Sequence, residues 1–151
     1  DVGELLAELA RPGECPDPPA DGRPLPVAAD PDALHGLFRN LLDNARRHGR
    51  SVQVIARAEG GAVVVEVADN GPGIAAADRE RIFDRFYRAP ELRSTPGSGL
   101  GLAIARAAAE RSGGSVRLLD SEVGARFEVR LPLAPDAAAG APAGGPAPVV
   151  R

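Results

Sequence analysis

The order of helical segments limits what this chain can fold into. Residues 31–48 carry apolar side chains on one stripe at helical spacing, between a capping Asp30 and a terminating Gly49. Residues 99–112 form an Ala-rich segment that also predicts a helix, and 76–83 predicts a short one.

The strand-like segments come in adjacent pairs. Residues 51–58 and 62–69 form the first pair, and 115–120 and 125–131 form the second, each with apolar residues alternating along the chain. Strands of a doubly wound sheet would instead alternate one by one with helices. The order therefore predicts an α+β fold, a two-layer sandwich with a mixed, largely antiparallel sheet packed under helices.

Gly and Pro divide the chain into regions. Residues 11–26 hold six Pro and two Gly, and 134–151 hold four Pro, three Gly and seven Ala, whereas 27–133 hold only 17 Gly and Pro together. We expect a domain over 1–133, with a leading helix at 1–10, a Pro-rich linker and a folded core. The Ala/Gly/Pro-rich tail is expected to be disordered, because it buries too little apolar surface to offset its ordering entropy.

Composition excludes several classes of site. The chain has no Lys, so it contains no Walker-type phosphate loop and no lysine nucleophile. Its single Cys15 forms neither an internal disulfide nor a Cys-rich zinc site. A net charge of −3 argues against a nucleic-acid partner. No apolar stretch is long enough to span a membrane, so we expect no membrane contact by this chain itself. The missing initiator Met suggests a fragment or an excised domain.

Asp69 is the first residue that suggests chemistry. It ends the strand 62–69 on the side of the buried valines, and Gly71 and Gly73 follow it closely. A buried carboxylate requires polar partners. The segment is either a tight turn with a capping Asp or a carboxylate that accepts a hydrogen bond from an amino group on a planar ring, for which the glycines leave room.

The polar edge of the 31–48 helix is the second feature. Asn40, Asn44 and Arg47 lie on one stripe beside the apolar face. They form either a solvated flank or an oxygen ligand for a hard cation such as Mg²⁺, with an Arg toward phosphate.

A Gly-rich segment at 97–102 opens the last helix. A helix N-terminus attracts anions, but the spacing of these glycines does not fit a dinucleotide fingerprint. The polar, Pro-containing residues 89–98 before it are a candidate lid.

Four segments together carry a family resemblance. The chain reads NLLDNARRH at 40–48, DNGPGI at 69–74, IFDRFYR at 82–88 and GSGLGLAIAR at 97–106. In this order they resemble the N box, first glycine box, F box and second glycine box of the histidine-kinase ATP-binding domain. That nucleotide-binding fold is shared with gyrase, heat-shock chaperone ATPases and mismatch-repair ATPases.

The resemblance implies ATP and Mg²⁺ as cofactors and assigns roles to residues. Asp69 would bind the adenine amino group with Gly73 close to the base, Asn44 would coordinate Mg²⁺, and Asn40 and Arg47 would lie beside the phosphates. Asn40, Asn44 and Arg47 would be catalytic. The residues expected to bind nucleotide are Asn40, Asn44, Arg47, His48, Asp69, Gly71, Gly73, Ile74, Phe83, Arg88, Gly97, Ser98, Gly99, Leu100, Gly101 and Leu102.

The resemblance also favours a kinase over a hydrolase. ATP-hydrolysing relatives usually carry Glu four residues before the metal-binding Asn, where this chain has Asn40, an amide that cannot act as a general base. The expected activity is transfer of the γ-phosphoryl group to a histidine. Neither His35 nor His48 has the Glu and Pro context of a phosphoacceptor, so the acceptor should lie on a separate dimerisation domain of the same kinase.

Further expectations follow from the same resemblance. The response regulator would be an indirect partner, and the domain would lie in the cytoplasm, with its parent protein either free or membrane-anchored. An anti-sigma-type serine kinase and a non-catalytic ATP-binding module remain alternatives. One departure concerns the strand that usually precedes the 31–48 helix, here reduced to 24–29, which leaves undecided whether the chain keeps the family's edge strand.

Overall fold

The computed structural model of the chain describes residues 1–14, 22–90 and 97–135. Three α-helices and four β-strands form within these ranges. They are α1 (Val2–Leu9), α2 (Pro31–His48), β1 (Val52–Glu59), β2 (Ala62–Asp69), α3 (Gly101–Arg111), β3 (Ser115–Leu119) and β4 (Arg126–Pro132). Residues 136–151 of the predicted tail at 134–151 lie outside the described residues, and the domain boundaries stay predictions.

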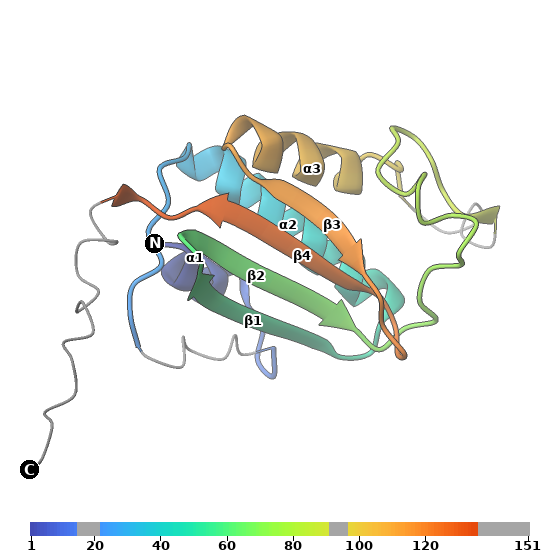
Figure 1. Cartoon of the computed structure of the whole chain (residues 1–151). Coiled ribbons are helices and arrows are strands. Elements are labelled where there is room, and N and C mark those ends of the chain that lie inside the picture. The colour runs from blue at the N-terminus through green and yellow to red at the C-terminus, as the bar shows by residue number, and fades with distance from the viewer. Residues whose placement is uncertain (15–21, 91–96, 136–151) are drawn as a thin grey trace, which may run out of the picture.

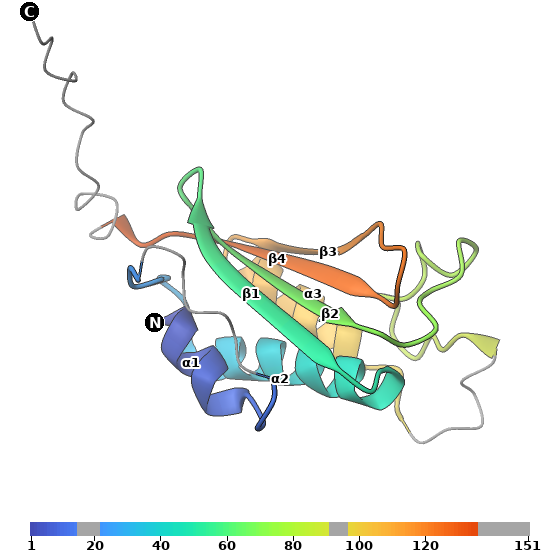
Figure 2. The same cartoon turned by 90° about the horizontal axis from the view of Figure 1, so that it is seen from below.

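The four strands form one antiparallel sheet in the order β1-β2-β4-β3. Helices α2 and α3 lie side by side on one face of this sheet, and α1 packs on α2 (Figure 1). Figure 2 shows the same arrangement from below, with the helices on a single side. The predicted α+β sandwich is confirmed, and within the described residues its sheet is antiparallel throughout rather than mixed.

Helix α2 forms where the capping residues and the apolar stripe predict it. Asp30 Oδ1 accepts a hydrogen bond from the Asp32 N–H at 3.0 Å, Pro31 occupies the first turn, and the Gly49 N–H donates to the Ala45 carbonyl at 2.8 Å. All six residues of the predicted stripe are buried: Leu34, Leu37, Phe38, Leu41, Leu42 and Ala45. This stripe rests on β1 and β2 and aligns the polar flank of the helix with the ends of those strands.

The core lies between the helices and the inner face of the sheet. Strand alternation directs every second side chain of each strand inward. Among the residues that are at most 1% exposed are Leu6, Leu25, Leu37, Phe38, Leu41, Val63, Val65, Val67, Phe127, Val129 and Leu131. Because these residues come from both ends of the described chain, α1 and the segment around Leu25 are part of the same core.

The short helix predicted at 76–83 is wrong. Residues 76–83 form consecutive turns, in which the Asp78 N–H donates to the Ala75 carbonyl and the Ile82 N–H to the Asp78 carbonyl. Tertiary contacts account for the difference, since the Asp78 side chain is buried and accepts a hydrogen bond from the Tyr87 hydroxyl. The segment therefore folds around that contact instead of extending as a helix.

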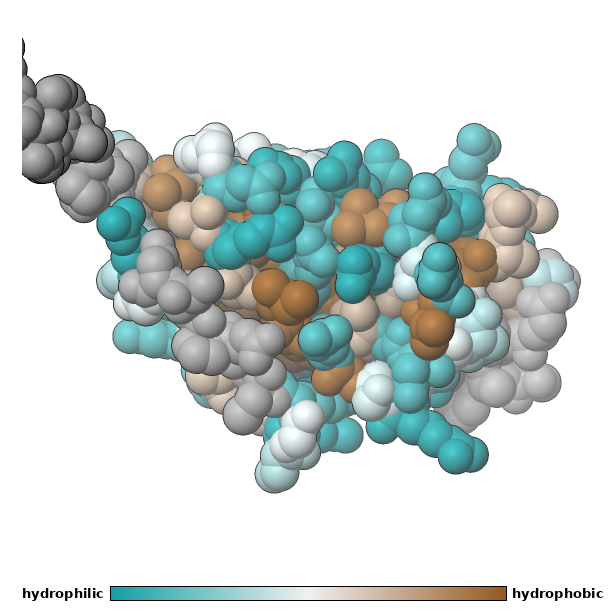
Figure 3. All heavy atoms as spheres, turned by 60° about the horizontal axis from the view of Figure 1, so that its bottom comes forward, coloured by the Kyte–Doolittle hydropathy of each residue, from teal (hydrophilic) through white to brown (hydrophobic). Residues whose placement is uncertain are grey.

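The short 24–29 segment left the edge of the sheet undetermined, and the structure shows how this segment pairs. Val27 forms one isolated antiparallel bridge with Leu133. Within residues 1–14, 22–90 and 97–135, no strand pairs with the free edge of β1. Figure 3 shows the face that includes this edge as mainly hydrophilic, with separate hydrophobic groups between the polar ones.

None of the helices that the structure describes has the length and apolar character of a membrane span.

Removing the largest core side chain of α2 tests this packing. Phe38→Ala should lower the free energy of unfolding by about 3–5 kcal/mol, because Phe38 is 0% exposed and the substitution leaves a cavity. Chemical denaturation measures the change. Arg39→Ala, at an exposed position of the same helix, should change it by less than about 0.5 kcal/mol. Equal effects of both variants would contradict the assigned packing.

Candidate functional site

Asp69 is a buried carboxylate at the end of β2, with 6% of its surface exposed. Its Oδ1 atom accepts hydrogen bonds from the backbone N–H groups of Gly71 at 2.8 Å and Ala125 at 3.3 Å. Its Oδ2 atom accepts no hydrogen bond from the residues that the structure describes. Two backbone donors thus orient the carboxylate and leave one oxygen for another partner.

Glycines allow the backbone to pack directly against Asp69. A Cβ atom on Gly124 would lie 1.8 Å from the Asp69 carbonyl oxygen, and one on Gly49 would lie 2.8 Å from the Asp69 Cβ. A Cβ on Gly71 would lie 2.3 Å from the His48 carbonyl oxygen. Gly124 also has φ +64°, which favours glycine. Because these glycines have no side chains, β2, the β3–β4 loop and the end of α2 can pack in direct backbone contact.

Sequence reasoning missed two residues of this cluster. Gly124 lies in the loop that supports Asp69, and its only sequence signal is a glycine directly before the last strand. Asn70 accepts hydrogen bonds through Oδ1 from the backbone N–H groups of Arg50 at 2.8 Å and Ser51 at 2.9 Å. Asn70 thereby ties the segment after α2 to the turn after β2.

The polar stripe of α2 faces the beginning of α3. The Asn40 Nδ2 donates to the Gly36 carbonyl at 2.8 Å, and its Oδ1 lies 3.3 Å from the position that a Cβ on Gly101 would take. Asn44 is half-buried, and its side-chain amide has no hydrogen-bond partner among the described residues. The Asn40 amide therefore lies beside the N-terminus of α3.

Two arginines converge on the glycine-rich segment. A Cβ on Gly97 would lie 2.9 Å from Arg47 Nη1 and 3.5 Å from Arg88 Nη2. Arg47 comes from the last turn of α2 and Arg88 from the segment before the predicted lid. Their guanidinium groups thus create positive charge beside Gly97.

The N-terminus of α3 has no side-chain cap. Leu100 occupies the capping position without a side-chain hydrogen bond, and the Ser98 Oγ accepts from the Leu100 N–H at 3.3 Å. The helix begins at Gly101 and ends at Arg111, slightly inside the predicted 99–112. No side chain among the described residues accepts a hydrogen bond from the N–H groups of Gly101 or Leu102, so these groups suit an anion, as the glycine-rich start suggested.

Gly99 and Phe86 hold this segment to the one before it. The Phe86 N–H donates to the Gly99 carbonyl at 3.0 Å, and a Cβ on Gly99 would lie 2.8 Å from the Phe86 carbonyl carbon. Phe86 is 70% exposed and has φ +63°, which is rare for a bulky residue. Of the predicted lid at 89–98, residues 91–96 lie outside the described residues.

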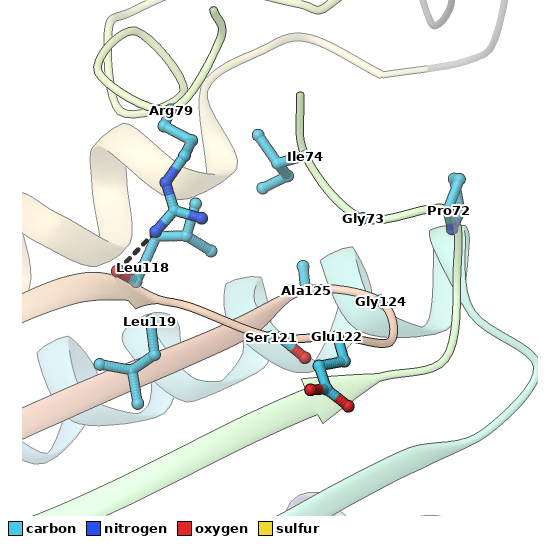
Figure 4. A pocket seen from close by; sticks show the side chains of 10 residues that line it. All are labelled: Pro72, Gly73, Ile74, Arg79, Leu118, Leu119, Ser121, Glu122, Gly124 and Ala125. Carbon is cyan, nitrogen blue, oxygen red and sulfur yellow. Dashed lines mark hydrogen bonds between the residues drawn. The ribbon is translucent and has the colours of Figure 1, made fainter. Parts of the chain in front are cut away.

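A small cavity adjoins Gly73 and Ile74 but not Asp69. It has a volume of about 130 Å³ and lies between the 72–79 segment and the β3–β4 loop (Figure 4). Arg79 crosses it to donate to the Leu118 carbonyl at 3.5 Å. Among the predicted site residues that the structure describes, only Gly73 and Ile74 line this cavity.

Two further residues of the predicted nucleotide site pack against the hydrophobic core. Phe83 packs edge-on against Phe127 with ring centroids 6.0 Å apart, so it supports the core under the site. Leu102 is half-buried against the same core. The structure thus brings the end of α2, the end of β2 and the segment before α3 close to one another. Within the described residues, no three His, Cys, Asp or Glu side chains cluster to bind a metal.

Burial lowers the pKa of His48, and the nearby Arg47 and Arg88 guanidinium groups lower it further, whereas Asp69 acts in the opposite direction. His48 is half-buried in the last turn of α2. The neutral imidazole is therefore the form that the folded protein favours.

Gly124→Ala should destabilise the protein, because the added Cβ collides with the Asp69 carbonyl and φ +64° disfavours alanine. Gly60→Ala is the matched control, since Gly60 has φ +57° with nothing within 4 Å of the added Cβ. We expect Gly124→Ala to cost at least about 2 kcal/mol more than Gly60→Ala in urea unfolding. Equal costs would show that only backbone strain matters at Gly124.

The lowered pKa of His48 makes stability dependent on pH. The unfolded chain binds its proton near pH 6.5, above the native pKa, so the free energy of unfolding should fall as pH decreases from about 7 to 5. His48→Gln should flatten that decrease in unfolding curves. An NMR titration that placed the His48 pKa above 6.5 would contradict this prediction.

The chain matches a family model. Residues 29–135 fit the model described as histidine kinase-, DNA gyrase B-, and HSP90-like ATPase. The sensor protein SphS of Synechococcus elongatus is 39% identical over 145 residues, which cover 87% of this chain and 34% of that protein. The histidine-protein kinase AfsQ2 of Streptomyces coelicolor is 44% identical over 110 residues, which cover 70% of this chain and 20% of that protein.

Solved structures of histidine kinases and their ATP-binding domains are also similar to this chain. The mycobacterial sensor histidine kinase MprB has a TM-score of 0.63 and 34% identity, over 71% of this chain and 76% of that one. The ATP-binding domain of PrrB from Mycobacterium tuberculosis has a TM-score of 0.65 and 27% identity, over 89% of this chain and 95% of that one. This chain therefore belongs to the histidine kinase-, DNA gyrase B-, and HSP90-like ATPase family, as a domain of the sensor histidine kinase type.

Proposed function

We propose that this chain binds Mg-ATP and transfers the γ-phosphoryl group to a histidine on a separate dimerisation domain of the same kinase. The observation that carries the proposal is the Asp69 carboxylate, buried at the end of β2 with one oxygen held by two backbone N–H groups and the other without such a partner among the described residues.

Asp69 suits the amino group of adenine. An ionised carboxylate only accepts hydrogen bonds, so its remaining oxygen favours a donor such as the exocyclic amine. Gly73 has φ +77°, and a Cβ there would lie 3.1 Å from the Gly124 carbonyl oxygen, so the missing side chain lets this turn pack against the loop that supports Asp69. A base that presented an acceptor instead would leave the second carboxylate oxygen of Asp69 without a partner.

The phosphates have two complementary sources of positive charge. The uncapped N-terminus of α3 offers backbone N–H groups, and the glycines at 97, 99 and 101 keep side chains out of their way. Arg47 and Arg88 add guanidinium groups beside Gly97. Together they would bind and orient a triphosphate chain at the end of the sheet, next to the amides of α2.

The donor groups fit a magnesium ion held mainly by ATP. Asn44 carries a half-buried amide without a hydrogen-bond partner among the described residues, and Mg²⁺ commonly takes one or two protein oxygens with phosphate and water. When bound, the ion would neutralise charge on the phosphate oxygens. Asn44 would hold it, and Arg47 would orient the terminal phosphate.

Asn40 favours transfer to an acceptor over hydrolysis. Its amide donates to the Gly36 carbonyl and offers no general base for a water molecule. In the proposed step the bond between the γ-phosphorus and its bridging oxygen breaks, a phosphorus–nitrogen bond forms on the acceptor histidine, and ADP leaves.

The partners of the whole protein belong to the proposal as well. The chain covers 34% of SphS and 20% of AfsQ2, so those proteins contain much sequence beyond the matched part. Full-length ShkA in complex with AMPPNP has a TM-score of 0.66 and 32% identity over 89% of this chain. We accordingly expect a dimerisation domain as the direct partner, a response regulator as the indirect one, and a cytoplasmic location for the domain.

Asp69→Asn should weaken Mg-ATP binding by about 10- to 100-fold, because a donor amide then faces the adenine amine. Asn44→Ala should reduce affinity in Mg²⁺ more than in EDTA. Titration calorimetry measures both, and Glu110→Gln, an exposed carboxylate near the end of α3, is the control that should bind normally. Normal binding by Asp69→Asn would refute the site, and absence of phosphohistidine on the added dimerisation domain would refute the kinase activity.

A further inference from the structure

Arg46 lies in the same turn of α2 as the proposed ligands Asn44 and Arg47 but points elsewhere. At 100° per residue, it stands about 200° from Asn44 and about 100° from Arg47 around the helix axis. Its guanidinium group contacts the N-terminal segment of the chain instead of the candidate site.

The contacts of Arg46 are numerous and largely buried. Arg46 Nε donates to both Glu14 carboxylate oxygens at 2.9 and 3.1 Å, and Nη2 donates to Glu14 Oε2 at 2.5 Å and to the Leu9 carbonyl at 2.9 Å. Nη1 lies 3.3 Å from Asp43 Oδ1. The Arg46 and Glu14 side chains are each 13% exposed. Such a forked pair is directional, so it fixes the relative position of its two elements.

Two partners of Arg46 lie at or just after the end of α1. Leu9 is the last residue of that helix, which has no basic residue in its last turn, so Arg46 supplies the positive charge that a helix C-terminus favours. Glu14 also accepts from the Arg11 N–H at 2.9 Å and donates its own N–H to the Arg11 carbonyl at 2.9 Å. One guanidinium group therefore joins α1, the turn at 11–14 and α2.

The same end of α2 is held from the other side by the turn after β2. Asn70 accepts from the Arg50 and Ser51 N–H groups, and the His48 carbonyl lies against Gly71 with no room for a Cβ. The last turn of α2 is thus confined between the N-terminal segment and the Asp69 turn. Because packed elements of this kind shift as units, a displacement of α1 would reach Asn44 and Arg47.

We propose that Arg46 is a positioning residue that couples residues 1–14 to the nucleotide site, so that nucleotide binding and the docking of α1 favour one another. The inference rests on the proposed function, because the coupling is between α1 and bound nucleotide. Coupling between two sites is reciprocal, so a contact that pulled α1 away would weaken nucleotide binding by the same factor. The strong hydrogen bonding is consistent with the direction of the pKa changes, since Arg46 lowers the pKa of Glu14.

Hydrogen exchange of the 151-residue chain with and without Mg-ATP tests this coupling. In the wild type, nucleotide should slow amide exchange in residues 2–9 by about fivefold or more, although none of these residues belongs to the site. In Glu14→Gln, which keeps the size of the side chain and removes its charge, nucleotide should still bind but about fivefold more weakly, and the slowing in residues 2–9 should be lost. Arg46→Lys, which keeps the charge without the fork, should lie between the two.

Arg57→Met is the matched control. Arg57 also binds two carboxylates, Glu59 and Glu66, each at 2.9 Å, but on the sheet face away from the helices. The Arg57→Met variant should bind nucleotide with wild-type affinity, and nucleotide should slow its amide exchange in residues 2–9 as in the wild type, even if its melting temperature falls. That result would show that loss of an ion pair alone does not remove the coupling.

The outcomes separate the inference from the proposed function. If the wild type binds nucleotide but exchange in residues 2–9 does not change, the coupling is refuted and the proposed function stands. Wild-type coupling in Glu14→Gln, even with a lower melting temperature, would also refute it, because the pair would then be structural only. If calorimetry detects no nucleotide binding by the wild type, both the proposed function and the inference fail.

Discussion

Direct backbone contact at the end of β2 is the constraint on which the candidate site depends. The Asp69 N–H donates to the Ala125 carbonyl at 2.9 Å, and the Asp69 carboxylate accepts the Ala125 N–H in return. This exchange requires Gly124 to lie against the Asp69 carbonyl without a side chain. A carboxylate that would otherwise be costly to bury is thereby satisfied on one oxygen and aimed by the main chain, which moves less than a side chain would.

Helix α2 connects this carboxylate to the rest of the molecule. Its apolar stripe packs on the sheet, so the helix cannot rotate without exposing core residues such as Phe38. With that rotation fixed, Asn40 lies beside Gly101 at the start of α3 and Arg47 beside Gly97, while Arg46 faces α1. The periodicity of one helix thus directs the residues for a ligand and those for the N-terminal segment to different sides.

Local patterns allowed much of this arrangement to be predicted. Each strand of the sheet and both long helices are recognisable from alternation, helical spacing and capping residues, because those signals depend on neighbours in the chain. Predicting the candidate site required the four motifs together. Taken alone, Asp69 fits an ordinary turn and Asn44 an ordinary helix flank equally well. The turns at 76–83 were not predictable, because Asp78 pairs with Tyr87 nine residues later.

The sequence by itself determined the four strands, the three helices that the structure describes and their order, because periodicity and strand parity decide which face each residue occupies. Only the tertiary structure showed that Gly124 supports Asp69 and that Asn70 holds the end of α2. The same holds for the contact between Arg46 and Glu14, which are 32 residues apart. Those contacts depend on how the chain folds back on itself, and no local pattern encodes the distance between segments that only packing brings together.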